Sequence, residues 1–155
     1  MEIRRATERD IADINELLNQ VNLVHHQGRP DIFKLARKYN DDQLKNIIKD
    51  DAKPIFVAVN EANDVVGYAF CMHQQHVGDN ILTDIKTLYV DDICVSDKAR
   101  GKRVGSALYE YVIEYAKSCG CYNVTLNVWS LNEGAMIFYE KCGMKPQKIG
   151  MEMIL

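Results

Sequence analysis

The segment Arg100-Gly101-Lys102-Arg103-Val104-Gly105-Ser106 combines basic residues with glycines, directly before a strongly patterned helix. A strand is predicted just before it, so the chain passes from a strand through a basic loop into a helix. The first turn of a helix has unpaired N–H groups and carries roughly half a positive charge. Glycine lets backbone amides approach an anion closely. The loop therefore predicts a binding site for a diphosphate, with a basic helix start that binds no ligand as the alternative.

The two common nucleotide motifs do not fit this loop. A P-loop requires G-x-x-x-x-G-K-[ST], whereas Gly105 follows Gly101 one residue too early and Ser106 stands in the place of the lysine. The pattern G-x-G-x-x-G near a first strand is also absent. These departures disfavour a nucleotide-binding phosphotransferase.

The elements that must position the loop alternate between strand and helix patterns. Three consecutive strands before the loop favour an α/β (α+β) fold, with a mixed sheet flanked by helices, over a purely parallel sheet. The helix after the loop has one apolar and one charged face. Strands are predicted at residues 2–5, 54–60, 65–76, 83–96, 122–128 and 148–155, and helices at 7–21, 31–39, 41–50, 104–119 and 132–142.

Length and composition predict one domain, residues 1–155, with 47% hydrophobic and 26% charged residues. The net charge of −3 makes nucleic acid and anionic membranes unexpected partners. No apolar run approaches the ~20 residues of a membrane span, and the first residues lack a secretory signal pattern. We therefore expect a cytoplasmic protein, whose five cysteines are reduced thiols because their number is odd and no CxxC occurs.

A second segment, Asn132 to Met144, has the sequence N-E-G-A-M-I-F-Y-E-K-C-G-M. Together with the loop it resembles the GNAT superfamily of N-acetyltransferases, which carry N-x-x-A-x-x-F-Y-x-K-x-G-F/M here and Q/R-x-x-G-x-G/A in their pyrophosphate loop. The resemblance covers residues 54–155, and the first strand and helix also fit. It implies a mostly antiparallel central sheet, splayed between the fourth and fifth strands. Arg103 stands where the family has its first loop glycine, so it needs a backbone conformation that glycine adopts more cheaply.

The resemblance implies an enzyme that transfers an acetyl group from acetyl-CoA, its co-substrate, to a primary amine of a small molecule or peptide. The attack would be direct, in a ternary complex, without a metal. A non-catalytic acyl-CoA-binding or sensor protein on the same fold is the alternative. The implied donor-binding residues are Ile93, Cys94, Val95, Arg100, Gly101, Lys102, Arg103, Val104, Gly105, Ser106, Asn132 and Tyr139.

The family also implies particular roles within this set. Main-chain groups of Ile93 to Val95 would pair with the pantetheine arm, in the manner of strand addition. Asn132 would bind the arm or the diphosphate, unless it is only a helix N-cap. Tyr139 would protonate the departing thiolate, unless it is only a packed aromatic beside Phe138. Arg103 could direct its side chain to the 3′-phosphate of CoA.

A base is useful because the acceptor amine, with a pKa of ~10, must lose a proton before it attacks. Asp91 and Asp92 lie near the end of the strand before the loop. Alternation puts them on opposite faces, with Asp91 on the same face as Tyr89, Ile93 and Val95. At most one of them therefore faces the acceptor. Members of the family carry basic groups four residues before the position of Val95, so the resemblance favours Asp91 as the base, with Asp92 as the second candidate and a purely structural role for both carboxylates as the alternative.

Histidines give weaker signals. His73 is a lesser candidate for the base, and because His73 and His76 fall on opposite faces of a strand, no zinc site is expected. Residues 24–51 correspond to the family's variable cover of the acceptor pocket. His25 to Phe33 would then line the acceptor site, unless this segment is a solvated loop with Phe33 in the core.

The acceptor and the oligomeric state are less constrained. Acidic residues near the expected mouth of the pocket, Asp84, Asp91 and Asp92, would favour a cationic amine. The apolar tail at residues 151–155 could pair across a homodimer.

Overall fold

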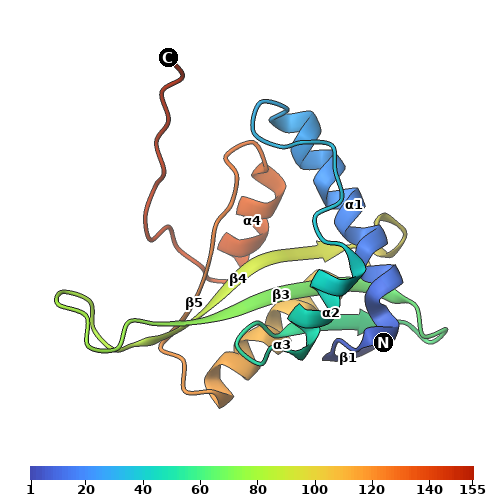
Figure 1. Ribbon diagram of the computed structural model, residues 1–155, viewed down its shortest axis with the longest axis horizontal. Helices are drawn as coiled ribbons and strands as arrows, with labels where there is room; N and C mark the ends of the chain where they lie inside the picture. The colour runs from blue at the N-terminus through green and yellow to red at the C-terminus, as the bar shows by residue number, and fades with distance from the viewer.

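A computed structural model describes all 155 residues, and its elements alternate as the sequence predicts over most of the chain (Figure 1). Five strands form one sheet in the order β1-β2-β3-β4-β5, antiparallel except for the parallel pair β4–β5. The predicted mixed α/β fold is confirmed. Its elements are β1 (Glu2–Arg5), α1 (Ile11–Gly28), α2 (Asp41–Lys49), β2 (Ile55–Val59), β3 (Val65–Gln75), β4 (Lys86–Val95), α3 (Val104–Ser118), β5 (Asn123–Leu126) and α4 (Glu133–Lys141), with short 3-10 helices at Glu8–Asp10 and Asp97–Ala99.

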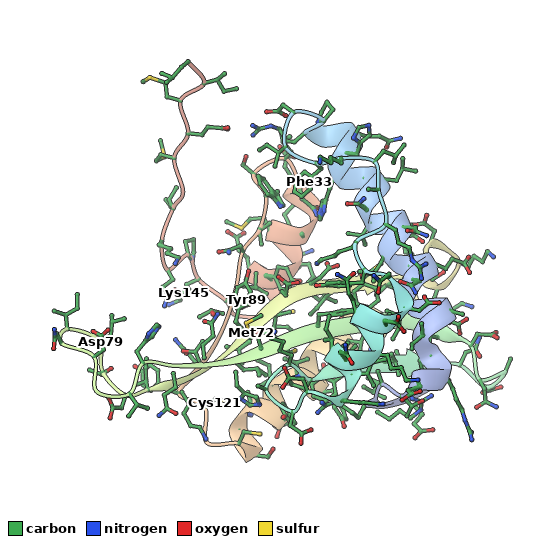
Figure 2. All side chains as sticks on the ribbon, viewed as in Figure 1. Phe33, Met72, Asp79, Tyr89, Cys121 and Lys145 are labelled. Carbon is green, nitrogen blue, oxygen red and sulfur yellow. The ribbon has the colours of Figure 1, made fainter.

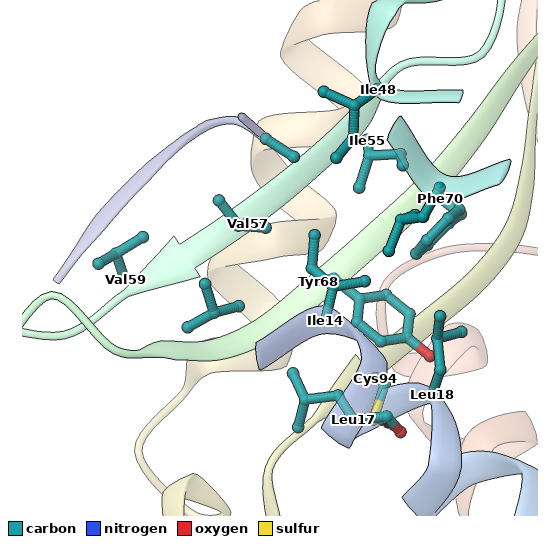
Figure 3. Close-up of a cluster of buried hydrophobic side chains, with 13 residues drawn as sticks. Ile14, Leu17, Leu18, Ile48, Ile55, Val57, Val59, Tyr68, Phe70 and Cys94 are labelled. Atoms are coloured by element: carbon teal, nitrogen blue, oxygen red, sulfur yellow. Dashed lines mark hydrogen bonds between the residues drawn. The ribbon is translucent and has the colours of Figure 1, made fainter. Parts of the chain in front are cut away.

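Helices cover both faces of the sheet and produce two apolar clusters. On one face, α1 and α2 pack Ile14 and Leu44 against a cluster that includes Tyr68 and Cys94 (Figure 3). On the other face, α3 packs along the sheet through residues such as Leu108. The strands between these layers are largely buried, which explains the nearly continuous apolar run of β2.

The helix predicted at residues 31–39 is wrong. The segment forms turns and bends, and α1 instead continues to Gly28. Side chains of α1 hold the segment by its backbone: Asn22 Nδ2 donates to the carbonyls of Lys34 and Ala36, and His26 Nδ1 lies 2.7 Å from the carbonyl oxygen of Phe33. Residues 148–155 do not form a paired strand within the chain, so the strand predicted there is not found.

Asp91 is the extra residue of a β-bulge. In the β3–β4 register Phe70 pairs with Asp92 and Cys71 with Val90, so Asp91 has no partner. The bulge reverses the alternation of faces: Val90 is buried against α3, whereas Cys94 is buried on the α1 side.

The predicted common face of Tyr89, Ile93 and Val95 is therefore wrong. Ile93 and Val95 pack on the α3 side of the sheet. Val90, which precedes the bulge, points to the same side, so its neighbour Tyr89 points to the opposite side.

Gly67 lets α3 pack directly on the sheet. A Cβ atom on this residue would lie 2.9 Å from the carbonyl oxygen of Cys94, 3.1 Å from Leu108 Cδ1 and 3.2 Å from Val104 Cγ1. The start of α3 is thereby fixed against β3 and β4, next to the basic loop.

The substitution Gly67→Ala is predicted to destabilise the protein by about 1–3 kcal/mol, because an added methyl group overpacks this contact. Thermal and denaturant unfolding measure the change. Gly134→Ala is the control, because the nearest atom to an added Cβ there is 3.9 Å away and alanine favours a helix. Equal stabilities for wild type and Gly67→Ala would show that α3 does not depend on this close approach.

Candidate active site

The sheet opens between β4 and β5. Their parallel pairing ends at Val90 and Leu126, and from Asp92 to Val95 the strand β4 pairs with β3 alone. The predicted splay between the fourth and fifth strands is therefore present. A cavity of about 220 Å³ lies against this part of β4, lined by Gln20, Val21, Val24, His25, Asp92, Ile93, Cys94, Val95, Arg100 and Asn132.

The cavity brings together residues that the sequence places far apart. The predicted donor-binding residues of β4, the loop residue Arg100 and Asn132, the N-cap of α4, all contribute to its lining. Gln20 and Val21 were predicted only as part of the first helix, and Val24 only as the start of the variable segment 24–51, so none of the three was predicted individually as a lining residue. Helical spacing that continues beyond Val21 is the signal that could have placed Val24 on this helix.

The basic loop has the strained backbone expected from its sequence. Gly101 has φ of 79° and Arg103 has φ of 59°, both in the left-handed region. An L-residue with a side chain adopts this region at a cost of roughly 1–2 kcal/mol. The prediction that Arg103 takes a conformation that glycine would adopt more cheaply is confirmed. Arg100 pairs with Asp97 at 2.6 Å, while the side chains of Lys102 and Arg103 are exposed.

The first turn of α3 has free donors. The backbone N–H groups of Val104, Gly105 and Ser106 make no hydrogen bond within the chain. A Cβ on Gly105 would lie 3.7 Å from Val95 Cγ2 and 3.8 Å from Phe138 Cζ, so this turn faces both β4 and α4. Unpaired amides at a helix start, beside three basic side chains, fit the diphosphate of a CoA donor.

Two candidate residues come from α4: its N-cap Asn132 and, within the helix, Tyr139. Asn132 Oδ1 accepts from the Ala135 N–H at 3.1 Å, so this side chain is an N-cap, and it also lines the cavity. The ring of Tyr139 lies 5.1 Å from Phe138 and 6.3 Å from Tyr109, between centroids. Burial, followed by the negative charge of Asp92, raises the pKa of Tyr139 to about 12. Its hydroxyl therefore stays protonated at neutral pH.

Asp92 and Asp91 occupy different environments. Asp92 lines the cavity and accepts a hydrogen bond of 2.6 Å from the hydroxyl of Tyr68. Burial raises the pKa of Asp92, although the bond from Tyr68 and the charge of Lys38 act in the opposite direction. Asp91 is exposed and its carboxylate lies 3.0 Å from Lys38 Nζ. Of the two candidate bases, it is Asp92 that the bulge turns toward the cavity.

An aromatic group lies beside the cavity at the end of α1. His25 stacks on Phe33 with centroids 4.8 Å apart, and Phe33 meets Trp129 edge-on at 5.2 Å. Phe33 is half-buried between the end of α1 and α4 rather than in the core (Figure 2). Trp129 was not predicted as a site residue. The feature that could have indicated Trp129 is its position shortly after β5, beyond Leu126, the last residue that pairs with β4.

His73, the weaker candidate for the base, does not line this cavity. His73 Nε2 lies 3.0 Å from the hydroxyl of Tyr115, and His73 lines a separate, open hollow of about 390 Å³ with Gln74, Gln75, Lys86 and Cys119. No group of three or more His, Cys, Asp or Glu side chains is placed to hold a metal ion. None of the helices combines the length and the apolar character needed to cross a membrane.

Comparisons with known proteins agree with this geometry. Residues 19–144 match the model of the Acetyltransferase (GNAT) family. The chain is 28% identical over 119 residues to glucosamine 6-phosphate N-acetyltransferase of Arabidopsis thaliana, covering 77% of this chain and 70% of that protein. It is also 28% identical over 137 residues to thialysine N-epsilon-acetyltransferase of Bos taurus, covering 87% and 72%. A crystal structure of a tetramutant of BH1408 from Bacillus halodurans matches with a TM-score of 0.95 and 30% identity over 100% of both chains.

The chain therefore belongs to the GNAT acetyltransferase family. It is an acyl-CoA-dependent N-acetyltransferase, and acetyl-CoA is the co-substrate that this family uses.

The pKa of Asp92 predicts a stability effect. Because this pKa is raised in the folded protein, the folded state binds the proton more tightly than the unfolded chain does. The stabilising effect of that proton is complete below the ordinary carboxyl pKa and is lost as pH rises through the raised value. Asp92→Asn, whose amide oxygen can still accept from Tyr68, is therefore predicted to raise Tm at pH 7.

Thermal unfolding at pH 7 and at about pH 3.5, below the ordinary carboxyl pKa, tests this effect. The gain should shrink at the lower pH. Asp91→Asn is the control, because the exposed ion pair between Asp91 and Lys38 contributes little to the stability of the fold. A lower Tm for Asp92→Asn at pH 7 would show that the ionised carboxylate is stabilising.

Proposed function

We propose that this enzyme transfers the acetyl group of acetyl-CoA directly to a primary amine of a small molecule or peptide, in a ternary complex. The observation that carries the proposal is the opening between β4 and β5. The free amides of α3, the carboxylate of Asp92 and the amide of Asn132 all lie around it.

The donor would bind along this opening. The N–H groups of Val104 to Ser106, with the basic side chains of the loop, would hold the diphosphate. The unpaired edge of β4 from Ile93 to Val95 would take the pantetheine arm as an added strand. Asn132 uses its Oδ1 atom as the helix cap, which leaves its Nδ2 group free to donate to the arm.

The proposed reaction has one covalent step. The neutral amine attacks the thioester carbonyl, a C–N bond forms, and the C–S bond breaks to give an acetamide and CoA. Asp92 would take the proton of the amine, directly or through water, because its raised pKa makes it a stronger base than an exposed aspartate. Tyr139 would hydrogen-bond to the sulfur and donate its proton as negative charge develops there.

The acceptor would enter beside His25, Phe33 and Trp129, which adjoin the cavity at the end of α1. In its ionised form, Asp92 would favour an acceptor that arrives as a cation. Two relatives are named for amine substrates, glucosamine 6-phosphate and thialysine. Both names support a small amine as the acceptor.

A panel of amines tests the proposal directly. Glucosamine 6-phosphate, thialysine, lysine, a polyamine and an aminoglycoside would each be incubated with enzyme and acetyl-CoA, and acetylated product measured by mass spectrometry. We expect acetamide formation with at least one amine, in step with CoA release. Tight acetyl-CoA binding without product from any amine, peptides included, would support a non-catalytic binder instead.

Tyr139→Phe is predicted to lower kcat by about 10²-fold or more, with acetyl-CoA affinity nearly unchanged, because only the hydroxyl is lost. Tyr109→Phe is the matched control, since Tyr109 packs against Tyr139 from α3. Steady-state kinetics and calorimetric titration measure the two quantities. Full activity of Tyr139→Phe on the true acceptor would contradict its role as the acid.

Arg103→Gly is predicted to weaken binding of acetyl-CoA about tenfold, through loss of one charged hydrogen bond to the 3′-phosphate. Glycine adopts the left-handed backbone at this position easily, so the fold should be retained. Acetyl-3′-dephospho-CoA is the control donor, and its affinity should not change. Equal losses for both donors would place the effect in the loop backbone rather than in a contact with the 3′-phosphate.

A further inference from the structure

Three aromatic rings meet where the end of α1 faces the segment after β5. His25 stacks on Phe33 with ring centroids 4.8 Å apart, and Phe33 meets Trp129 at 5.2 Å and 76°. Phe33 lies between the end of α1 and α4 (Figure 2). His25 also lines the cavity that contains Asp92. The three rings therefore form an aromatic cluster that shares a wall with this cavity.

The aromatic cluster is held in place from both sides. The N–H group of Phe33 donates to the carbonyl of Arg29 at 2.9 Å, and the Phe33 carbonyl oxygen lies 2.7 Å from His26 Nδ1. A Cβ atom on Gly28 would lie 3.9 Å from Leu131 Cδ1, so the residues just after Trp129 contact the end of α1. Rings that are already positioned lose little freedom when a ligand binds to them.

The cluster keeps much of its apolar surface open. Trp129 is 44% exposed, and the adjoining residues Val24 and Leu131 are 55% and 68% exposed. Tryptophan is highly buried on average in folded proteins, and a cluster that only fastened α1 to the segment after β5 would enclose its rings. Open apolar surface beside a cavity with a few polar groups is typical of a ligand-binding site.

The cationic side chains around the cluster are mostly neutralised within the chain. Of the four Arg and Lys side chains in residues 24–40, three pair with carboxylates: Arg29 with Asp31 and Glu152, Arg37 with Asp41, and Lys38 with Asp91. The fourth, Lys34, is exposed. A phosphate or carboxylate group of an acceptor would have to compete with the carboxylates already bound. The surroundings of the cluster therefore favour an apolar group over an anionic one.

We infer that the acceptor is an arylalkylamine, a primary amine joined through a short alkyl chain to an aromatic ring. The ring would pack against Trp129 and Phe33 with the offset or edge-on contacts that aromatic pairs prefer. The amino group would lie at Asp92. This inference rests on the proposed function and narrows its substrate class. Glucosamine 6-phosphate, the substrate named for one relative, has no aromatic ring and should be a poorer acceptor here.

A comparison of three amines tests the inference. Initial rates at saturating acetyl-CoA would be measured for 2-phenylethylamine, for ethylamine, which has the same chain without the ring, and for glucosamine 6-phosphate. We expect kcat/KM for 2-phenylethylamine to exceed that for ethylamine about 10- to 100-fold, because the ring leaves water for the aromatic cluster.

The outcomes separate this inference from the proposed function. Equal kcat/KM values for 2-phenylethylamine and ethylamine, or a higher value for glucosamine 6-phosphate, would overturn the inference and leave the proposed function intact. Acetylation of other amines but not of 2-phenylethylamine would have the same meaning. A lack of product with every amine would overturn the proposed function, and the inference with it.

Variants of Trp129 test where the ring binds. Trp129→Ala should lower kcat/KM for 2-phenylethylamine about tenfold, with the value for ethylamine and the KM for acetyl-CoA nearly unchanged. Trp129→Phe keeps a ring and should restore most of the preference. Tyr122→Ala is the matched control, because Tyr122 is 75% exposed at the opposite end of β5 and should not affect the preference. Equal losses for both amines in Trp129→Ala would overturn the assignment of the cluster as the ring's binding site.

Discussion

The site depends on one unpaired residue in β4. Asp91 has no partner on β3, and the side chains that follow it point to the opposite faces from those expected by simple alternation. A bulge of this kind bends the strand and increases its twist. Pairing with β5 stops at Val90, next to the bulge. The same distortion therefore opens the sheet and turns Asp92 toward Tyr68 and the cavity.

The opening is useful because α3 is fixed beside it. Because Gly67 has no side chain, α3 packs in direct contact with β3 and β4, and its residues Val104 and Leu108 are buried there. This packing also stabilises the loop, including the left-handed backbone of Arg103, which costs roughly 1–2 kcal/mol. Burial of Leu108 alone is worth a comparable amount. The helix can thus hold a strained turn whose free amides face the opening.

Features that depend on local patterns could be predicted from the sequence, while features that depend on pairing could not. The amphipathic pattern of α3 and the N-cap at Asn132 identified the loop and the second segment with nearly correct bounds. The bulge at Asp91 has no local signal, because it exists only relative to β3. Residues 31–39 have a helical pattern, but Asn22 and His26 bind their backbone carbonyls instead. At residues 148–155 the strand pattern is clear, yet the chain supplies no partner strand.

Electrostatics separates the two groups that the proposed reaction needs. Burial raises the pKa of both Asp92 and Tyr139, but they start far apart, near 4 and 10. The negative charge of Asp92 raises the pKa of Tyr139 further, so ionisation of the base keeps the acid protonated. Lys38 and His25 act in the opposite direction on Asp92 and favour its ionised form. Tyr139 therefore stays protonated at neutral pH, while Lys38 and His25 favour the ionised form of Asp92, and these are the states that thiolate protonation and amine deprotonation require. Burial of an ionised Asp92 works against folding, a cost that the proposed role as the base would explain.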